Sequence, residues 1–488
     1  MNLIKNKHIL SVIIFLSIFI TSCDNYLDVN VDPNQSNTSD LGLQLSSGQL
    51  YTAIGFGQRI FPIISIWSQY HTGGPGVSLG DPDQHILSST EGNEIFRSVY
   101  RAANNMNFII KEAPEEKFYV AMAKIMKAYG IQTCADLFGD IPYLEALKGD
   151  IEDGSILHPK YDNAKDVVYP ALAAELISAA QILHDGGSFR HPAGDDLVYG
   201  GDLAKWEKFA NTLLLKLYLR SGNTAKATEL IASGAPFITT NDEAAMVRFP
   251  GGSTGSNPFW TAAKSTALGN FYVATTTALN YLESTNDPRI DYLYDRNDNG
   301  DHKGMDPGDV EQAPTSSAVF SKPAGALKSA GGLIFSPTAP VIFLSAWEGN
   351  LLLAEAAALG AGGDAKVSYE NAVKESFAYL GVTAGADATY LAGKGAFDAA
   401  NPIKSIAYQK WVCMNGLQPI ESWIETRRMD DAGQPLFASN GGIFKSPTKN
   451  ALGTGIFPSI LPYPEIEESL NQNFVGQHGL TAKVFWDK

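Results

Sequence analysis

The sequence predicts a mainly α-helical protein in which tetratricopeptide-like helical hairpins pack against a loop-rich half. Apolar residues at 118, 122, 125 and 129 fall at helical spacing and mark one buried helix face. Two later segments, at about 214–231 and 359–372, place residues where a tetratricopeptide unit has its packing positions. Between them, residues 236–340 contain many glycine and proline turns and are predicted to be rich in loops, and loops this long are usually functional or disordered. The alternative is that the two segments are unrelated helical hairpins.

The chain begins with a segment typical of a secretory signal peptide. Lys5 and Lys7 precede an apolar run at residues 9–20, which is shorter than the roughly 20 residues of a membrane-spanning helix. The run leads into Ile-Thr-Ser-Cys, which resembles a bacterial lipoprotein box, so we expect cleavage after residue 22 and lipid on Cys23. The alternative is an ordinary signal peptide with Cys23 just inside a soluble product. We expect residues 23–40 to form a flexible tether and residues 41–488 to form a single domain.

Helix ends are predicted from glycine and proline. The helix that carries the apolar face at 118–129 should end near the Phe-Gly-Asp-Ile-Pro segment at 138–142. A second apolar stripe at 172–183 should end at Gly186-Gly187. In the two hairpins, the small side chains of Ala227 and Ala372 would let the second helix approach the first closely.

Composition and charge exclude some classes of protein. Hydrophobic residues make up 44% of the chain and charged residues 18%, as in globular proteins with a substantial core. The net charge is -16, which argues against nucleic acid as a partner. Cys134 and Cys413 lie in apolar helical patterns and are expected to pack as small hydrophobes, although export would also permit a disulfide between them.

Several short motifs follow one another along the chain, at residues 26–28, 138–142, 200–213, 287–289, 348–356, 409–411, 421–428 and 462–473. No single motif is decisive, but in this order they resemble the SusD/RagB family of outer-membrane nutrient-binding lipoproteins, in its divergent SusD-like branch.

The resemblance implies a SusD-like fold whose loop-rich half faces the ligand. It also implies a lipid-anchored, surface-exposed outer-membrane protein that acts as a lid on a SusC-like TonB-dependent transporter. Such a lid captures an oligosaccharide or a peptide for import, without catalysis and with no required cofactor. Two other functions stay open: a structural helical-repeat adaptor of an envelope complex, and a surface hydrolase.

Catalytic motifs are weak in this chain. Residues 251–255 fit Gly-x-Ser-x-Gly, but a nucleophile elbow needs a helix directly after the serine, and Asn257-Pro258 opposes one there. No His-Glu-x-x-His motif occurs, and no acid pair stands out as a glycosidase pair. Arg427 and Arg428 are interpreted as helix ion-pair partners of nearby glutamates rather than as an anion site.

The segment from 295 to 306 has the oxygen spacing of an EF-hand loop. Acid or amide side chains stand at positions 1, 3 and 5, glycine at position 6 and an acid at position 12, which suits a structural Ca²⁺ site. The alternative is a polar surface loop of turn-forming residues. The predicted ligands are Asp295, Asn297, Asn299, Asp301 and Asp306.

Three aromatic clusters are predicted to form the ligand face, because sugars stack on flat apolar rings. They lie at a helix end or in the loop-rich middle of the chain, and buried packing is the alternative for each. By contrast, Trp206, Trp411 and Trp423 lie on helical motifs and are predicted to belong to the core. The predicted ligand-binding residues are Trp67, Tyr70, His71, Phe259, Trp260, Phe271 and Tyr272.

Overall fold

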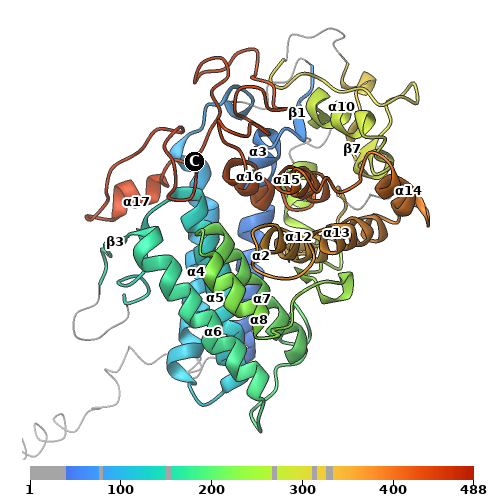
Figure 1. Cartoon of the computed structure of the whole chain (residues 1–488). Helices are drawn as coiled ribbons and strands as arrows, with labels where there is room; N and C mark the ends of the chain where they lie inside the picture. Colours follow the sequence, from blue (N-terminus) through green and yellow to red (C-terminus); the bar gives the residue numbers. More distant parts are fainter. Residues whose placement is uncertain (1–39, 76–80, 150–155, 266–271, 310–315, 326–333) are drawn as a thin grey trace, which may run out of the picture. The chain divides into compact units, whose positions relative to one another are not determined.

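The computed structural model describes residues 40–75, 81–149, 156–265, 272–309, 316–325 and 334–488, and Leu41–Lys488 forms one compact unit. The predicted signal peptide, Cys23 and nearly all of the tether lie outside these residues. The mainly α-helical prediction is confirmed (Figure 1). The α-helices are α2 (Leu41–Gly57), α3 (Ile60–Trp67), α4 (Asn93–Glu112), α5 (Lys117–Phe138), α6 (Tyr169–Asp185), α7 (Leu203–Arg220), α8 (Thr224–Ala232), α9 (Pro258–Ser265), α10 (Thr276–Ser284), α11 (Ile290–Leu293), α12 (Ala346–Ala358), α13 (Ala365–Leu380), α14 (Ala386–Ala392), α15 (Pro402–Met414), α16 (Pro419–Arg428) and α17 (Glu465–Leu470).

Consecutive helices pack side by side in the first half of the unit. Helix α4 packs between α2 and α5, and α6 packs between α5 and α7 (Figure 1). Helix α5 ends at Gly139, whose φ of 84° suits glycine, and α6 ends at Gly186 with a φ of 64°, as the sequence predicts. Residues Ala164–Asp185 are long and apolar enough to cross a membrane by length and composition alone, and 33% of the apolar window is buried. In this structure α6 packs with one buried face against α5 and α7.

Both predicted hairpins form. Helices α7 and α8 pack on each other, with Ala227 fully buried between them, and α12 packs on α13 with Ala372 buried. Side-chain caps start these helices: Asp202 accepts a hydrogen bond from the Lys205 backbone, and Ser345 accepts one from the Glu348 backbone. Helix α12 also packs on α7 and on α15, so it connects the helices of the first half of the unit with those of the second half.

Short antiparallel strand pairs join segments that are far apart in the sequence. Strand β1 (His71–Gly73) pairs with β5 (Tyr272–Ala274). This pairing makes two of the three predicted aromatic clusters neighbours, the one that ends at His71 and the one that ends at Tyr272. The other pairs are β2 (Ile141–Pro142) with β3 (Tyr161–Asp162), β4 (Ala245–Val247) with β8 (Val341–Leu344), and β6 (Tyr294–Asp295) with β7 (Lys322–Pro323). The predicted loop-rich region at 236–340 therefore contains short helices and strands as well as loops.

Two large hydrophobic clusters form most of the core, and two small clusters add to it. The first lies mainly among α2 to α7 and also includes α9 and α16, and the second lies mainly among α10 to α15. Trp206, Trp411 and Trp423 are buried, as predicted. Cys134 and Cys413 are buried free thiols in different clusters, so no disulfide joins them. Cys134 packs as a small hydrophobe, whereas the Cys413 sulfur accepts a hydrogen bond from Arg289 at 3.1 Å and donates one to Gln409 at 3.8 Å.

An ion-pair network, buried or nearly so, connects α5, α7, α12, α15 and α16. Arg220 contacts Asp136 and Glu425 at 2.6 and 2.7 Å, and it also pairs with Glu421. Burial opposes ionisation of Glu425, but Arg428, Lys410 and Arg220 outweigh this effect and lower its pKa well below the usual value. The network comprises Lys216, Arg220, Lys410, Arg428, Asp136, Glu348, Glu355, Glu421 and Glu425.

The sequence predicts that Arg427 and Arg428 both pair with nearby glutamates of their helix, and only Arg428 does so. Arg428 pairs with Glu425 at 2.7 Å within α16 and also reaches Glu355 on α12. Arg427 donates instead to the backbone carbonyls of Trp423 and Asp136, and its guanidinium stacks over the Trp423 ring. Tertiary packing thus gives neighbouring arginines different partners.

Candidate functional site

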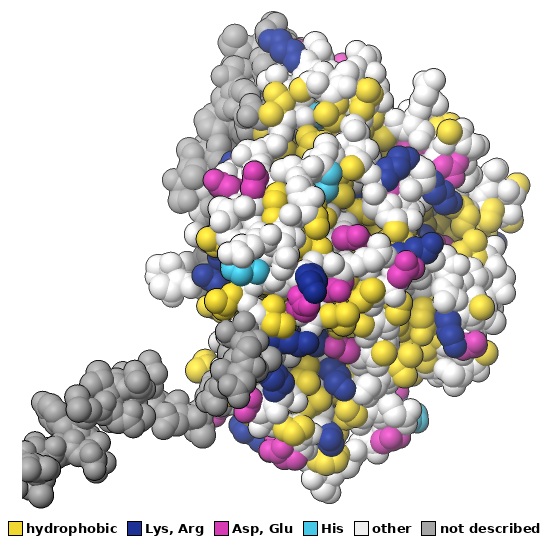
Figure 2. Space-filling model, turned by 90° about the vertical axis from the view of Figure 1, so that its left-hand side faces the viewer, with side chains coloured by type: hydrophobic (Ala, Val, Ile, Leu, Met, Phe, Trp, Pro, Cys, Tyr) yellow, Lys and Arg dark blue, Asp and Glu magenta, His cyan; other side chains and the backbone are white. Residues whose placement is uncertain are grey.

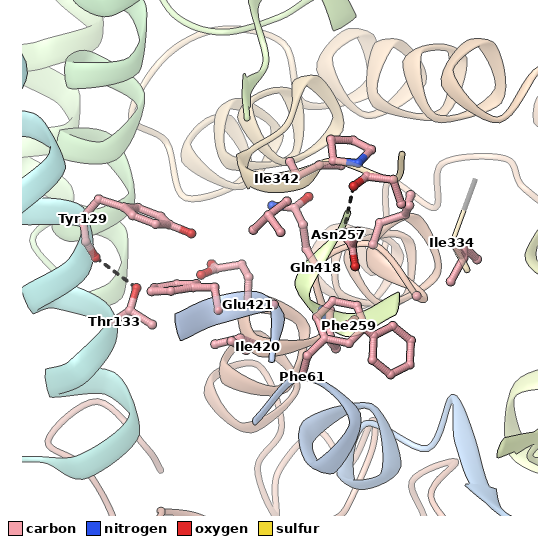
Figure 3. Close-up of a pocket in the computed structure, with 18 residues that line it drawn as sticks. Phe61, Tyr129, Thr133, Asn257, Phe259, Ile334, Ile342, Gln418, Ile420 and Glu421 are labelled. Atoms are coloured by element: carbon pink, nitrogen blue, oxygen red, sulfur yellow. Dashed lines mark hydrogen bonds between the residues drawn. The ribbon is translucent and has the colours of Figure 1, made fainter. Parts of the chain in front are cut away.

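A pocket lies where α2, α3, α5, α9, β8 and the turn between α15 and α16 meet (Figure 3). The turn is tight because Gly416 adopts a φ of 71°, and a Cβ at this position would come within 2.7 Å of Ile334. Figure 3 shows Tyr129, Thr133 and Glu421 at one end of the pocket and Phe61, Phe259 and Ile334 toward the other. The pocket therefore has a polar end and an aromatic end.

The polar end holds buried hydrogen-bonding groups. Gln418 donates to Glu348 at 2.7 Å, while its own side-chain oxygen has no hydrogen-bond partner among the described residues. Burial, reinforced by the nearby carboxylates of Glu348 and Glu421, raises the pKa of Tyr129 well above its usual value, so this hydroxyl stays neutral. The enclosed volume of about 40 Å³ is enough for ordered water but far below the roughly 300 Å³ that small-molecule pockets need.

The aromatic end continues into a row of rings, which we call the aromatic row: Phe61, Phe259, Phe335 and Trp260. Ring centroids are 5.0 Å apart for Phe61 and Phe259, 5.5 Å for Phe259 and Phe335, and 4.7 Å for Phe335 and Trp260. Phe61 and Trp260 are half-buried, whereas Phe259 and Phe335 are buried, so the row is partly exposed at these two residues. A sugar could therefore stack on this row without entering the small cavity.

Asn257 positions the start of α9 and hence Trp260. Its side-chain oxygen accepts a hydrogen bond from the Trp260 backbone at 3.0 Å, and its amide donates to the Ala339 carbonyl at 2.8 Å. This cap ties the helix to the segment before β8 and holds the indole beside Phe335.

The first predicted aromatic cluster, Trp67, Tyr70 and His71, is buried. Buried packing is the alternative to ligand binding for this cluster. Trp67 donates to the Pro82 carbonyl at 3.1 Å, and its ring packs against Trp423. Tyr70 donates to the Trp411 carbonyl, and burial lowers the pKa of His71 to about 3, so its imidazole is neutral. These three side chains offer no open face to a sugar in this structure.

The other predicted aromatics divide between core and surface. Phe259 lines the pocket, and Tyr272 is buried with its ring 5.9 Å from that of Phe259. Trp260 is the half-buried member of this group. Phe271 lies outside the described residues.

The loop at 295–306 does not form the predicted arrangement of calcium ligands. The Asn297 side-chain oxygen accepts hydrogen bonds from the Asn299 and Asp301 backbones at 3.0 and 2.9 Å, so it faces amides rather than a cation. Asp295 accepts from the Gly325 backbone, and Asp306 pairs with Lys445 at 2.8 Å. Among the described residues, no group of three or more His, Cys, Asp or Glu side chains could hold a metal. These contacts are those of a polar surface loop, and the calcium site stays a prediction.

The Gly-x-Ser-x-Gly segment is a turn rather than a nucleophile elbow. Gly251 bonds to the Gly255 carbonyl at 2.9 Å, which closes the turn, and Ser253 is exposed. Helix α9 starts only at Pro258, several residues later. The arrangement therefore lacks the strand-serine-helix geometry of that motif.

Sequence reasoning missed Phe61, Phe335 and Gln418. Phe61 lies in an apolar run that reads as core, and Phe335 follows a glycine-rich stretch without a periodic pattern. Gln418 belongs to a short turn between two helices, and its place in the pocket is fixed by a hydrogen bond to Glu348, which is distant in the sequence. None of these residues carries a local signal that marks a site.

Comparison with known proteins agrees with this fold. The chain is similar to a chitin-binding protein, with 23% identity, a TM-score of 0.77, and coverage of 92% of this chain and 100% of the other. A chitin-binding SusD homologue from Flavobacterium johnsoniae has 22% identity and a TM-score of 0.73, with coverage of 91% and 97%. A SusD-like protein from Bacteroides thetaiotaomicron has 22% identity and a TM-score of 0.72, with coverage of 92% and 99%.

Identities this low support the fold alone. No curated protein matches the sequence. The family model described as "Starch-binding associating with outer membrane" matches residues 61–464, which is most of the chain. The chain therefore belongs to the SusD-like family.

Proposed function

We propose that this protein is a cell-surface lipoprotein that binds a glycan and delivers it to a SusC-like TonB-dependent transporter. The family match carries the proposal, because that family is described as starch-binding and associated with the outer membrane. The half-buried rings of the aromatic row supply the stacking surface that glycan binding requires. Two structural relatives are chitin-binding, so chitooligosaccharide and maltooligosaccharide are the first ligands to test.

Replacing Trp260 with alanine should weaken glycan binding about tenfold, or ~1.4 kcal/mol, because the ring contributes stacking area at the end of the row. Isothermal titration of both oligosaccharides into the purified protein measures this change. We expect the native affinity to lie between micromolar and millimolar, about -8 to -4 kcal/mol.

Tyr218→Ala is the matched control, because Tyr218 is a half-buried aromatic residue on α7 outside the aromatic row. It should leave binding unchanged. Equal affinities for the native protein and Trp260→Ala, with unchanged melting curves, would remove the aromatic row from the proposal. Shortened oligosaccharide products after incubation would instead support the hydrolase alternative.

The transporter partnership predicts a complex that survives mild detergent extraction. Purification from the native membrane through a C-terminal tag should recover a barrel-sized partner, since permanent complexes bury more than roughly 2,000 Å². Mass spectrometry of the co-eluting bands identifies the partner. Recovery of the lipoprotein alone would favour the adaptor function.

A further inference from the structure

A second open groove lies between α2, α4, the segment at 142–147 and the start of α17. Its volume is about 710 Å³, within the roughly 300–1,000 Å³ of small-ligand sites. It shares no lining residue with the pocket of Figure 3. The lining residues that carry the argument are Tyr51, Tyr100, Arg97, Arg101, Asn104 and Asn105.

The outward face of α4 supplies cations and amides to this groove. Arg97, Arg101 and Asn104 follow helical spacing and are exposed on that face. The Arg101 guanidinium lies 5.9 Å from the centre of the Tyr51 ring, which is 37% exposed. Arg97 is 3.9 Å from Glu94, longer than a hydrogen-bonded ion pair.

The remaining groups favour an anionic ligand. Within the described part of the chain, neither Asn104 nor Asn105 has a hydrogen-bond partner for its side chain, so both amides can serve a ligand. Glu467 is the sole acid among the lining residues, and it already accepts hydrogen bonds from Tyr161 and Asn471 at 2.8 and 3.1 Å. The groove thus presents two arginines in a chain whose net charge is -16.

The groove wall is held in place by its own contacts. The Tyr100 hydroxyl donates to the Pro142 carbonyl at 2.6 Å, and the Tyr100 and Phe96 rings lie 4.5 Å apart. Figure 2 views the molecule from the side on which α17 lies in Figure 1, and below the centre of that face Lys and Arg side chains lie among Asp and Glu side chains. A fixed aromatic wall beside cations favours a flat ligand that carries negative charge.

We infer that this groove binds a carboxylate-bearing oligosaccharide. A sugar ring stacks on the Tyr51 face, the guanidinium of Arg101 forms a bidentate pair with the sugar carboxylate, and the two asparagines bond to hydroxyls. A neutral sugar would make no use of the positive charge of the two arginines. The inference rests on the proposed glycan-binding function and names a sugar class for a second site.

Oligogalacturonate is the probe, with maltooligosaccharide and chitooligosaccharide as neutral comparisons, titrated calorimetrically into the full mature protein. Arg101→Gln should weaken oligogalacturonate binding at least tenfold and leave neutral binding unchanged. Tyr51→Ala should also weaken it, whereas Tyr51→Phe should retain most of the affinity. Added salt should weaken this binding, since the site is open to solvent.

Arg190→Gln is the matched control, because the Arg190 guanidinium also lies over a tyrosine, Tyr119, at 5.1 Å but outside the groove. It should leave oligogalacturonate binding unchanged. Binding that is insensitive to both Arg101→Gln and Tyr51→Ala, or no oligogalacturonate binding at all, overturns the inference. Neutral-glycan binding that depends on Trp260 would in that case still uphold the proposed function, whereas failure of every glycan would overturn both.

Discussion

Replacing Arg220 with leucine should lower the free energy of unfolding by about 3–5 kcal/mol, because it leaves several buried carboxylates without their shared cation. The Arg220 side chain is 1% exposed and contacts Asp136 at 2.6 Å and Glu425 at 2.7 Å. Chemical denaturation, monitored by circular dichroism, measures the change in the free energy of unfolding. We expect the variant to melt well below the native protein, since this loss is a large share of a typical stability.

The control for this variant is Arg296→Leu, which makes the same substitution at a solvent-exposed ion pair. Arg296 contacts Asp291 at the similar distance of 2.7 Å, but the two side chains are 50% and 46% exposed. Exposed pairs contribute about 0–1 kcal/mol, so this variant should unfold almost like the native protein. If both variants lose the same stability, burial is not what makes the Arg220 pairs important.

Replacing Cys23 with alanine should move the protein from the membrane fraction to the soluble exported fraction. Acyl chains on this cysteine would supply the anchor, and each buried methylene contributes about 0.8 kcal/mol. The expectation comes from the short apolar run at 9–20 and the Ile-Thr-Ser-Cys sequence that follows it. Fractionation and mass spectrometry of the mature amino terminus measure the result.

The assay for Cys23 needs a strain without the SusC-like transporter, because a bound barrel would hold the protein at the membrane by itself. Cys134→Ala removes a buried free thiol and should leave the membrane fraction unchanged. Membrane attachment of Cys23→Ala in that strain would contradict lipidation. Recovery of the native protein in the soluble exported fraction, with an unmodified amino terminus, would instead support the ordinary signal peptide.

The helical elements could be predicted because their signals are local. Apolar spacing within a few turns predicts α5 and α6, and Gly139 and Gly186 stop them for a conformational reason that needs no other part of the chain. The hairpin packing at Ala227 and Ala372 was predictable in the same way, since closely packed helices need small side chains. The calcium site stays a prediction, and oxygen spacing alone could not show that the Asn297 side-chain oxygen accepts hydrogen bonds from the Asn299 and Asp301 backbones in this structure.

The sequence by itself determined the helical class, the helix ends, the two hairpins and the family resemblance, which all depend on residues close in the chain or on motif order. Only the tertiary structure decided which aromatics are exposed. Trp67 and Trp260 have similar local signals, yet one packs against Trp423 and the other lies half-buried beside Phe335. Exposure depends on what distant segments bury, and the partners of Arg220 come from helices about 80 and 200 residues away. Such long-range contacts leave no period or spacing in the sequence from which they could be predicted.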